Sequence, residues 1–204
     1  MIVDFRTIKN HMIVWPITHI IDQHPGEIML DIGANIGTIT ADMARKAAHV
    51  YAFEPHPDNL KELYARCGDM ENVTIIEGAA GNRNGSFKLF PCATNPGGHT
   101  MSEIVAEPKT WDHDPGTWMM VKEIRGDDFV AGLGANKRVG LIKIDVEGYE
   151  CQVLEGLVQT LKNHRPILAL ETHQTIDLTR LGELLKGYQI QGGDLKVDSA
   201  YVCI

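Results

Sequence analysis

The feature that most constrains the fold is a short apolar run that ends in an acid and opens into a glycine-spaced turn, within residues 27–37. Residues 28–30 have the pattern of a buried parallel strand, and residues 38–46 have the pattern of a helix. Gly33 and Gly37 lack side chains, so the backbone can turn tightly there and a ligand can approach it closely. The sequence therefore predicts the strand, loop and helix of a nucleotide-cofactor site.

A second apolar strand, residues 50–53, ends in Glu54, where an acid can accept hydrogen bonds from ribose hydroxyls. Asp31 precedes the glycine loop, and a carboxylate there would repel a pyrophosphate but suits the sulfonium and ammonium charges of S-adenosylmethionine (SAM). The loop also departs from the G-x-G-x-x-G pattern of dinucleotide sites. We therefore expect SAM as the cofactor. Its expected contacts are Asp31, Gly33, Ala34, Asn35, Gly37, Glu54 and Pro55. The alternative is that the glycines only pack a helix onto the sheet, with Asp31 as the helix cap.

Three segments resemble the signature blocks of a known family: residues 31–37 (DIGANIG), 52–60 (AFEPHPDNL) and 142–150 (IKIDVEGYE). They are similar to those of FkbM-family class I SAM-dependent methyltransferases, and the last block is the most specific to that family. The resemblance spans residues 27–172. It implies a Rossmann-like fold and, usually, methyl transfer to a hydroxyl oxygen of a sugar, lipid or natural product.

Strand and helix patterns alternate along the chain, which is typical of a doubly wound parallel sheet. The expected strands are residues 28–32, 49–54, 73–77, 86–90, 119–124, 139–145 and 166–171. The expected helices are residues 17–23, 38–47, 57–67, 149–162 and 175–186, with a further start at 127. Residues 188–191 and 196–203 predict a hairpin. We expect an α/β, Rossmann-like, doubly wound, mostly parallel sheet with a C-terminal antiparallel hairpin, the class I methyltransferase fold, in a single domain over residues 1–204.

Two segments lie outside this alternation. Residues 1–25 are expected to form an N-terminal cap over the cofactor pocket. Residues 91–118 lack periodicity and are rich in Pro, Gly, His and Trp, as in lids and binding loops. A substrate-covering lid is expected there, and a mobile loop without a defined role is the alternative. The residues most able to touch a ligand are His99, Trp111, His113 and Trp118.

Ligands of an open parallel sheet bind beyond the carboxyl ends of its strands. Methyl transfer requires alignment of the acceptor oxygen, and a general base helps when the hydroxyl is unactivated. We expect Asp145, His173 and Glu171 as catalytic residues, with Asp145 also near the cofactor; capping of the next helix is the alternative for Asp145. Glu147 and Glu150 fall near that helix N-terminus, where the macrodipole favours acids. The family resemblance implies a place for Glu147 in the pocket.

Further residues near the strand ends are candidates for an ion pair, an adenine wall or a metal site. Lys143 lies in a buried strand and needs a charge partner, Asp145 or Glu171. Ala79 and Ala80 follow the third strand and leave room for adenine. Asp145, Glu171 and His173 could together hold a divalent ion. Because the sequence shows no dense acidic cluster, we expect no metal.

Composition limits the partners. The net charge of -8 disfavours nucleic acid as substrate. Four cysteines without C-x-x-C spacing argue against disulfides and zinc. No apolar run is long enough for a membrane span, and no signal peptide is evident, so we expect a cytoplasmic protein with a small-molecule or glycan hydroxyl substrate. The alternatives are a non-catalytic SAM-binding module, an NAD-dependent oxidoreductase and an RNA 2′-O-methyltransferase.

Overall fold

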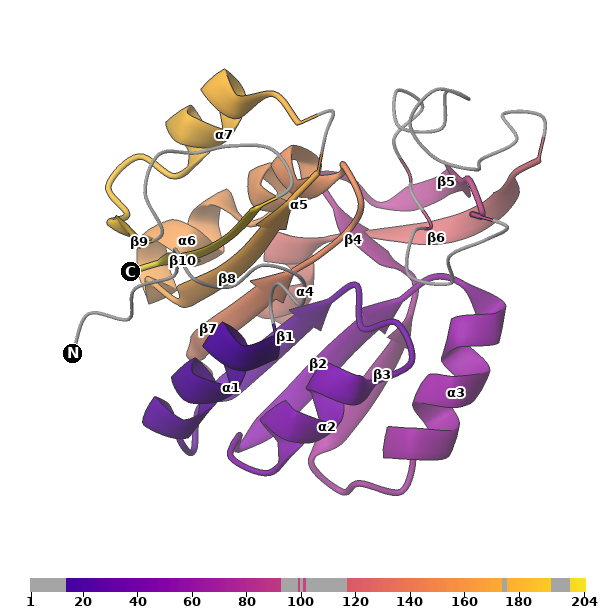
Figure 1. Cartoon of the computed structure of the whole chain (residues 1–204), viewed down its shortest axis with the longest axis horizontal. Helices are drawn as coiled ribbons and strands as arrows, with labels where there is room; N and C mark the ends of the chain where they lie inside the picture. The colour runs from indigo at the N-terminus through magenta and orange to yellow at the C-terminus, as the bar shows by residue number, and fades with distance from the viewer. Residues whose placement is uncertain (1–13, 93–98, 100, 102–116, 174–175, 192–198) are drawn as a thin grey trace.

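The computed structural model describes residues 14–92, 99, 101, 117–173, 176–191 and 199–204. The strands of its main sheet are β1 (Ile28–Ile32), β2 (His49–Glu54), β3 (Val73–Glu77), β7 (Val139–Ile144), β8 (Ile167–Thr172), β9 (Ile190–Gln191) and β10 (Ser199–Cys203). Within the described residues these strands lie in the order β3-β2-β1-β7-β8-β10-β9 (Figure 1). The first five are parallel, and β10 is antiparallel to both β8 and β9. The expected class I methyltransferase fold with its antiparallel C-terminal strands is confirmed.

Helices cover both faces of this sheet. They are α1 (Val14–Gln23), α2 (Thr38–Ala44), α3 (Pro57–Cys67), α4 (Gly126–Gly132), α5 (Glu150–Gly156), α6 (Val158–His164) and α7 (Leu178–Leu184). Successive residues of a strand point to opposite faces, and the core divides accordingly. Met29 and Leu141 pack with Ile17 of α1, whereas Leu30 and Ile142 pack with the cluster that includes α5 and α7. The sheet is therefore doubly wound, as predicted.

The two central strands, β1 and β7, are apolar in sequence because both of their faces are buried. Every residue of β1 and β7 is buried, as expected for parallel strands covered on both faces. Asp31 and Lys143 are the exceptions in composition, and they stand directly opposite each other in the β1–β7 register. Their alternation with Met29 and Leu141 places both on the face covered by α1 and α2.

A second, smaller sheet is attached at the carboxyl end of β3. Its strands are β4 (Ala79–Gly81), β5 (Gly85–Leu89) and β6 (Met119–Arg125), in the order β4-β6-β5. Only Gly78 separates β3 from β4, so this sheet begins where the parallel strands end (Figure 1). The sequence predicts β5 and β6 but not β4, which is short and built of small residues.

The helix expected over residues 149–162 is instead two helices, α5 and α6, separated at Leu157. The carboxylate of Asp127 in α4 accepts hydrogen bonds from the backbone nitrogens of Gln159 and Thr160, at 3.0 and 2.9 Å. It also accepts one from the Thr160 hydroxyl at 2.8 Å. Asp127 thus caps a new helix start, which a pattern confined to residues 149–162 could not reveal.

The two flanking segments are described only in part. The expected helix near the N-terminus is present as α1, while residues 1–13 lie outside the described residues, so the cap over the pocket stays a prediction. In the expected lid, Trp111 and His113 also lie outside them, and Trp118 is 46% exposed. Among the described helices, none is long and apolar enough to cross a bilayer.

Candidate cofactor and acceptor site

An open cavity of about 770 Å³, partly continuous with solvent, lies at the carboxyl ends of β1, β2, β7 and β8. Chain order reverses between β1 and β7, and such a switch point is where open α/β sheets bind ligands. Near β1, β2 and β4 its wall includes Gly33, Asn35, Glu54, Pro55, Asn59, Ala79 and Ala80. Near β7 and β8 its wall includes Asp145, Val146, Glu147, Tyr149 and Glu171, joined by Leu89, His99 and Met101. We call these the cofactor side and the acceptor side of the cavity.

The glycine loop owes its composition to the protein's own packing. Gly33 has φ of 81°, and a Cβ atom there would lie 1.8 Å from the carbonyl oxygen of Asp145. Gly37 has φ of 82°, and its Cβ would lie 2.6 Å from a methyl carbon of Leu63 in α3. Both glycines therefore fix a left-handed turn between close neighbours, and the turn leaves Gly33 and Asn35 on the cavity wall.

Glu54 is held in place by three protein donors. One carboxylate oxygen accepts from the backbone nitrogen of Asn35 at 2.8 Å. The other accepts from the backbone nitrogen of His56 at 2.8 Å and from the side chain of Asn59 at 3.4 Å. Burial raises the pKa of Glu54, and these hydrogen bonds oppose the shift. A carboxylate accepts about four hydrogen bonds, so capacity remains for a ligand on the oxygen that Asn35 contacts.

Asp31 lies behind the cavity rather than on its wall. It is fully buried, accepts a hydrogen bond from the Thr40 hydroxyl at 2.6 Å, and lies 3.2 Å from the ammonium nitrogen of Lys143. Ala34 and Gly37, also expected cofactor contacts, are likewise absent from the wall formed by the described residues. Direct contact of these three residues with a cofactor stays a prediction.

Lys143 links the two sides of the site. Its ammonium group donates to the carbonyl oxygen of Gly33 and lies 3.6 Å from a carboxylate oxygen of Asp145. The predicted ion pair with Asp145 is confirmed, and Asp31 is a second partner. Burial alone would lower the pKa of Lys143, but the two carboxylates raise it above its ordinary value. Lys143 is therefore a buried cation shared between β1 and β7.

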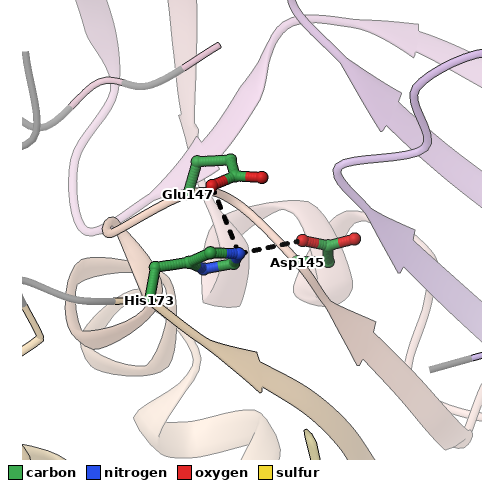
Figure 2. A group of neighbouring side chains, drawn as sticks. All are labelled: Asp145, Glu147 and His173. Carbon is green, nitrogen blue, oxygen red and sulfur yellow. Dashed lines mark ion pairs between the residues drawn. The ribbon is translucent and has the colours of Figure 1, made fainter. Parts of the chain in front are cut away.

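His173 sits among three acids: Asp145 and Glu147 from the segment between β7 and α5, which Figure 2 shows beside its ring, and Glu150. Its Nε2 lies 3.2 Å from Glu147 and 3.8 Å from Asp145, and its Nδ1 lies 2.6 Å from Glu150. Glu150 is fully buried at the start of α5. Because carboxylates flank both ring nitrogens, the arrangement suits the imidazolium form, which donates from both. Burial would lower the pKa of His173, but the hydrogen bond to Glu150 and the surrounding acids raise it to about 9.

Two acids of the acceptor side, Glu147 and Glu171, have raised pKa values. Burial raises the pKa of Glu147 to about 8, the attraction of His173 opposes that shift, and repulsion from Asp145 adds to it. Burial and then repulsion from Asp145 raise the pKa of Glu171 to about 7. Glu147 also has φ of 51°, which is uncommon for a residue other than glycine or asparagine. The acceptor side is thus a strained, acid-rich surface that takes up protons near neutral pH.

The structure brings Asp145 and Glu171 to the cavity wall, but His173 lies behind it among the described residues. Glu147, expected on the wall only through the family resemblance, does lie there. Ligand atoms of Asp145, Glu147 and His173 all fall within 4.8 Å of one another, so Glu147 replaces Glu171 in the set that could surround a cation. The premise that no dense acidic cluster exists is wrong, because the fold gathers acids that are dispersed in the sequence. The absence of a metal stays a prediction.

The remaining wall is formed by small, aromatic and apolar residues. Ala79 and Ala80 of β4 lie on the cavity wall, and their contact with adenine stays a prediction. His99 lines the cavity and stacks on His56, with ring centroids 3.9 Å apart. Tyr149, which the sequence analysis did not assign to the site, donates its hydroxyl to Glu123 at 3.1 Å, which fixes its ring at the acceptor side.

Comparison with known proteins gives the same fold. The structure aligns with that of a methyltransferase FkbM from Methylobacillus flagellatus KT, with a TM-score of 0.59 and 21% sequence identity. The alignment covers 88% of this chain and 44% of that chain. It also matches a putative methyltransferase from Streptococcus mutans in complex with SAH, with a TM-score of 0.56, 11% identity and 97% of both chains covered. At these identities the similarity concerns the fold.

Sequence comparison identifies relatives. The chain is 31% identical over 163 residues to the hexuronic acid methyltransferase AglP of Haloferax volcanii, covering 78% of this chain and 61% of AglP. It is 30% identical over 166 residues to the 31-O-demethyl-FK506 methyltransferase FkbM of Streptomyces tacrolimicus, covering 68% and 62%. It is 28% identical over 155 residues to the 2-O-methyltransferase NoeI of Sinorhizobium fredii, covering 70% and 62%. The chain spans about three fifths of the length of these relatives.

The family model described as "Methyltransferase FkbM domain" matches residues 31–189, which contain all three sequence blocks and both sides of the cavity. The resemblance seen in the sequence is confirmed: this chain belongs to the FkbM methyltransferase family.

Proposed function

We propose that this chain is a SAM-dependent O-methyltransferase that methylates a hydroxyl group of a sugar, glycan, lipid or natural product. The observation that carries the proposal is the single cavity that joins two chemically different sides across the switch point of the sheet. One side offers a glycine turn and a carboxylate held by backbone donors. The other offers several carboxylates that could receive a proton from an acceptor hydroxyl.

The cofactor side fits SAM through the chemistry of its residues. Glu54 would accept a hydrogen bond from a ribose hydroxyl, and the exposed backbone of Gly33 and Asn35 would lie against the methionine portion. Ala79 and Ala80 would flank adenine. When bound, SAM supplies an electrophilic methyl group on a positively charged sulfur. The carboxylate of Asp145, at the boundary of the two sides, would favour that charge.

The acceptor side would hold the hydroxyl and take its proton. We assign proton acceptance to the carboxylates on the cavity wall, with Asp145 and Glu171 as the expected catalytic groups. His173 contacts Asp145 and Glu147 from behind and is itself fixed by Glu150, so it would act as a positioning residue for these carboxylates. A general base is most effective when its pKa lies near the pH at which the enzyme works, and the pKa of about 7 for Glu171 suits that role.

The names of two relatives support a hydroxyl acceptor. FkbM is named for the 31-O position of FK506 and NoeI for a 2-O position, whereas the name of AglP specifies only a hexuronic acid. We carry over to this chain only an oxygen as methyl acceptor, which the names of FkbM and NoeI have in common. The acid group of the AglP substrate is not carried over.

The proposal is tested by calorimetric titration of SAM into the wild type and Glu54→Ala. Loss of a hydrogen bond to a charged group is worth about 1.5–3 kcal/mol, so we expect SAM affinity to fall tenfold or more. Glu62→Ala, an exposed position on α3, is the matched control and should bind SAM normally. Equal affinity in the Glu54 variant would remove that residue from the site. Thermal stabilisation of the wild type by NAD but not by SAM would favour an oxidoreductase instead.

A further inference from the structure

The acceptor side of the cavity has a marked charge imbalance. Asp145, Glu147 and Glu171 all line it, and among the described residues of the wall none is a lysine or arginine. Two buried cations lie behind this wall: Lys143 pairs with Asp31 and Asp145 and donates to the Gly33 carbonyl, and His173 contacts Asp145 and Glu147. Of the charged groups in the described part of the wall, a ligand on this side therefore meets carboxylates rather than these cations.

These carboxylates already repel one another. Burial is the main cause of the raised pKa values of Glu147 and Glu171, and repulsion from Asp145 raises both further. Like charges within about 4–6 Å disfavour each other's ionised form. An acceptor bearing its own carboxylate or phosphate beside these residues would add to that repulsion, and its binding would be weakened or would force further protonation of the wall.

The same residues favour a different kind of ligand. An ionised carboxylate only accepts hydrogen bonds, so a matching ligand must present hydroxyl or ammonium donors. Leu89, Met101 and the ring of Tyr149 add an apolar surface to the acceptor side. A sugar ring has both properties, with hydroxyl donors at its edge and C–H groups on its face.

We propose that the methyl acceptor is a donor-rich hydroxyl compound without a negative charge near the methylated oxygen, such as a neutral or amino-bearing sugar. This inference rests on the proposed function and deepens it. In the reaction, the acceptor oxygen forms a bond to the methyl carbon while the sulfur–carbon bond breaks and its electron pair stays on sulfur. The hydroxyl proton passes to a carboxylate of the wall.

Matched sets of acceptors test the proposal. Each set contains the methyl glycosides of a neutral hexose, its 2-amino form and its uronic acid, in the gluco and galacto series. Transfer of labelled methyl from SAM is measured, together with calorimetric binding of each compound to protein saturated with S-adenosylhomocysteine. We expect the neutral or amino member to exceed the uronic acid at least tenfold in kcat/KM and in affinity. Preference for the uronic acid, or turnover of no neutral or amino member, overturns the proposal.

Two variants connect the preference to the wall. In assays at pH 9, where both carboxylates are ionised, Glu147→Gln and Glu171→Gln should each reduce the discrimination against the uronic acid at least threefold, whatever their effect on overall rate. Glu183→Gln, an exposed position on α7, makes the same change in formal charge and should leave the ratio unchanged. An unchanged ratio in both wall variants would contradict the assignment.

Failure of this inference can be separated from failure of the proposed function by SAM titration. If SAM binds and uronic acids are the better acceptors, only the acceptor class is wrong. If SAM does not bind, both proposals fall.

Discussion

The two sides of the cavity treat their acids in opposite ways. On the cofactor side, Glu54 is satisfied by three donors, and behind it Asp31 is satisfied by Thr40 and Lys143, so each carboxylate has one fixed geometry before any ligand arrives. On the acceptor side, Glu147 and Glu171 face other acids, and their pKa values of about 8 and 7 reflect burial and mutual repulsion. The first side is preorganised, whereas the second holds charge that depends on pH and on its ligand.

The largest effect is expected where the two sides meet, at Lys143. Replacing it with Met leaves the fully buried Asp31 without its cation and removes the donor to the Gly33 carbonyl. Removing one partner of a buried ion pair costs about 3–5 kcal/mol, so we expect a loss of that size in the free energy of unfolding. Urea denaturation measures it, with the exposed Lys162→Met of α6 as control. A loss below about 1 kcal/mol, as for a surface ion pair, would show that this buried pair contributes little to stability.

The second effect is on stability as a function of pH, and it should come from the acceptor side. His173 has a folded pKa of about 9 against 6.5, so its stabilising contribution is complete below pH 6.5 and is lost as the pH rises through 9. Glu147 has a folded pKa of about 8 against 4.5, so its ionisation is penalised increasingly between those values. The folded state therefore binds more protons than the unfolded state, and stability should fall as the pH rises from about 5 to 9.

Glu147→Gln sharpens this prediction. The amide cannot ionise, so the variant should lose much of the decline, and above pH 8 it should match or exceed the wild type by about 1–3 kcal/mol. Thermal denaturation across pH 5–9 detects such a change as a shift of about 2–4 °C per kcal/mol. The exposed Glu62→Gln of α3 should keep the wild-type profile. A profile that stays flat in the wild type would mean that the acids are better compensated than their contacts indicate.

Parts of the fold that depend on local sequence patterns were predictable, whereas parts that depend on contacts between distant residues were not. β1 and β7 were predictable because strands covered on both faces are continuous apolar runs, and Asp31 and Lys143 stood out as exceptions. The break between α5 and α6 was not predictable locally. It depends on Asp127, which lies 32 residues before Gln159 and caps the second helix from another element.

The site residues were also only partly predictable from the sequence. The place of Glu54 on the cavity wall was predictable because it ends β2, a local property. Glu150 was assigned to a helix N-terminus, and it does begin α5, but its carboxylate also contacts His173, 23 residues later in the chain. Strand-end position predicts which residues reach the crevice, while the charge balance among them depends on side-chain contacts between elements. The family block around Glu147 was the only sequence signal for its place on the wall.

A smaller effect should separate SAM from S-adenosylhomocysteine, which lacks the sulfonium charge. As Glu171 and Glu147 ionise between about pH 6 and 9, the acceptor side gains negative charge beside the place that we propose for the sulfur. We expect the ratio of SAM to S-adenosylhomocysteine affinity to rise about tenfold over this range, or roughly 1.4 kcal/mol. Calorimetric titrations of both ligands measure the ratio. A constant ratio would place the sulfur on the preorganised side, away from the titrating acids.

The smallest effect is expected from divalent metal ions. Asp145, Glu147 and His173 come close enough together to surround an ion, yet His173 already contacts Glu147 at 3.2 Å and Glu150 at 2.6 Å. To coordinate a metal, an imidazolium must lose a proton, which weakens binding at neutral pH. At pH 7 we therefore expect chelator, millimolar Mg²⁺ or Mn²⁺ to change the melting temperature and SAM affinity by less than the measurement error. Stabilisation by several degrees with Mn²⁺, abolished in Glu147→Gln but retained in Glu183→Gln, would instead show that a metal neutralises the acceptor side. The charge that distinguishes this side from the cofactor side would then be balanced by an ion rather than by protons and the acceptor's hydroxyl groups.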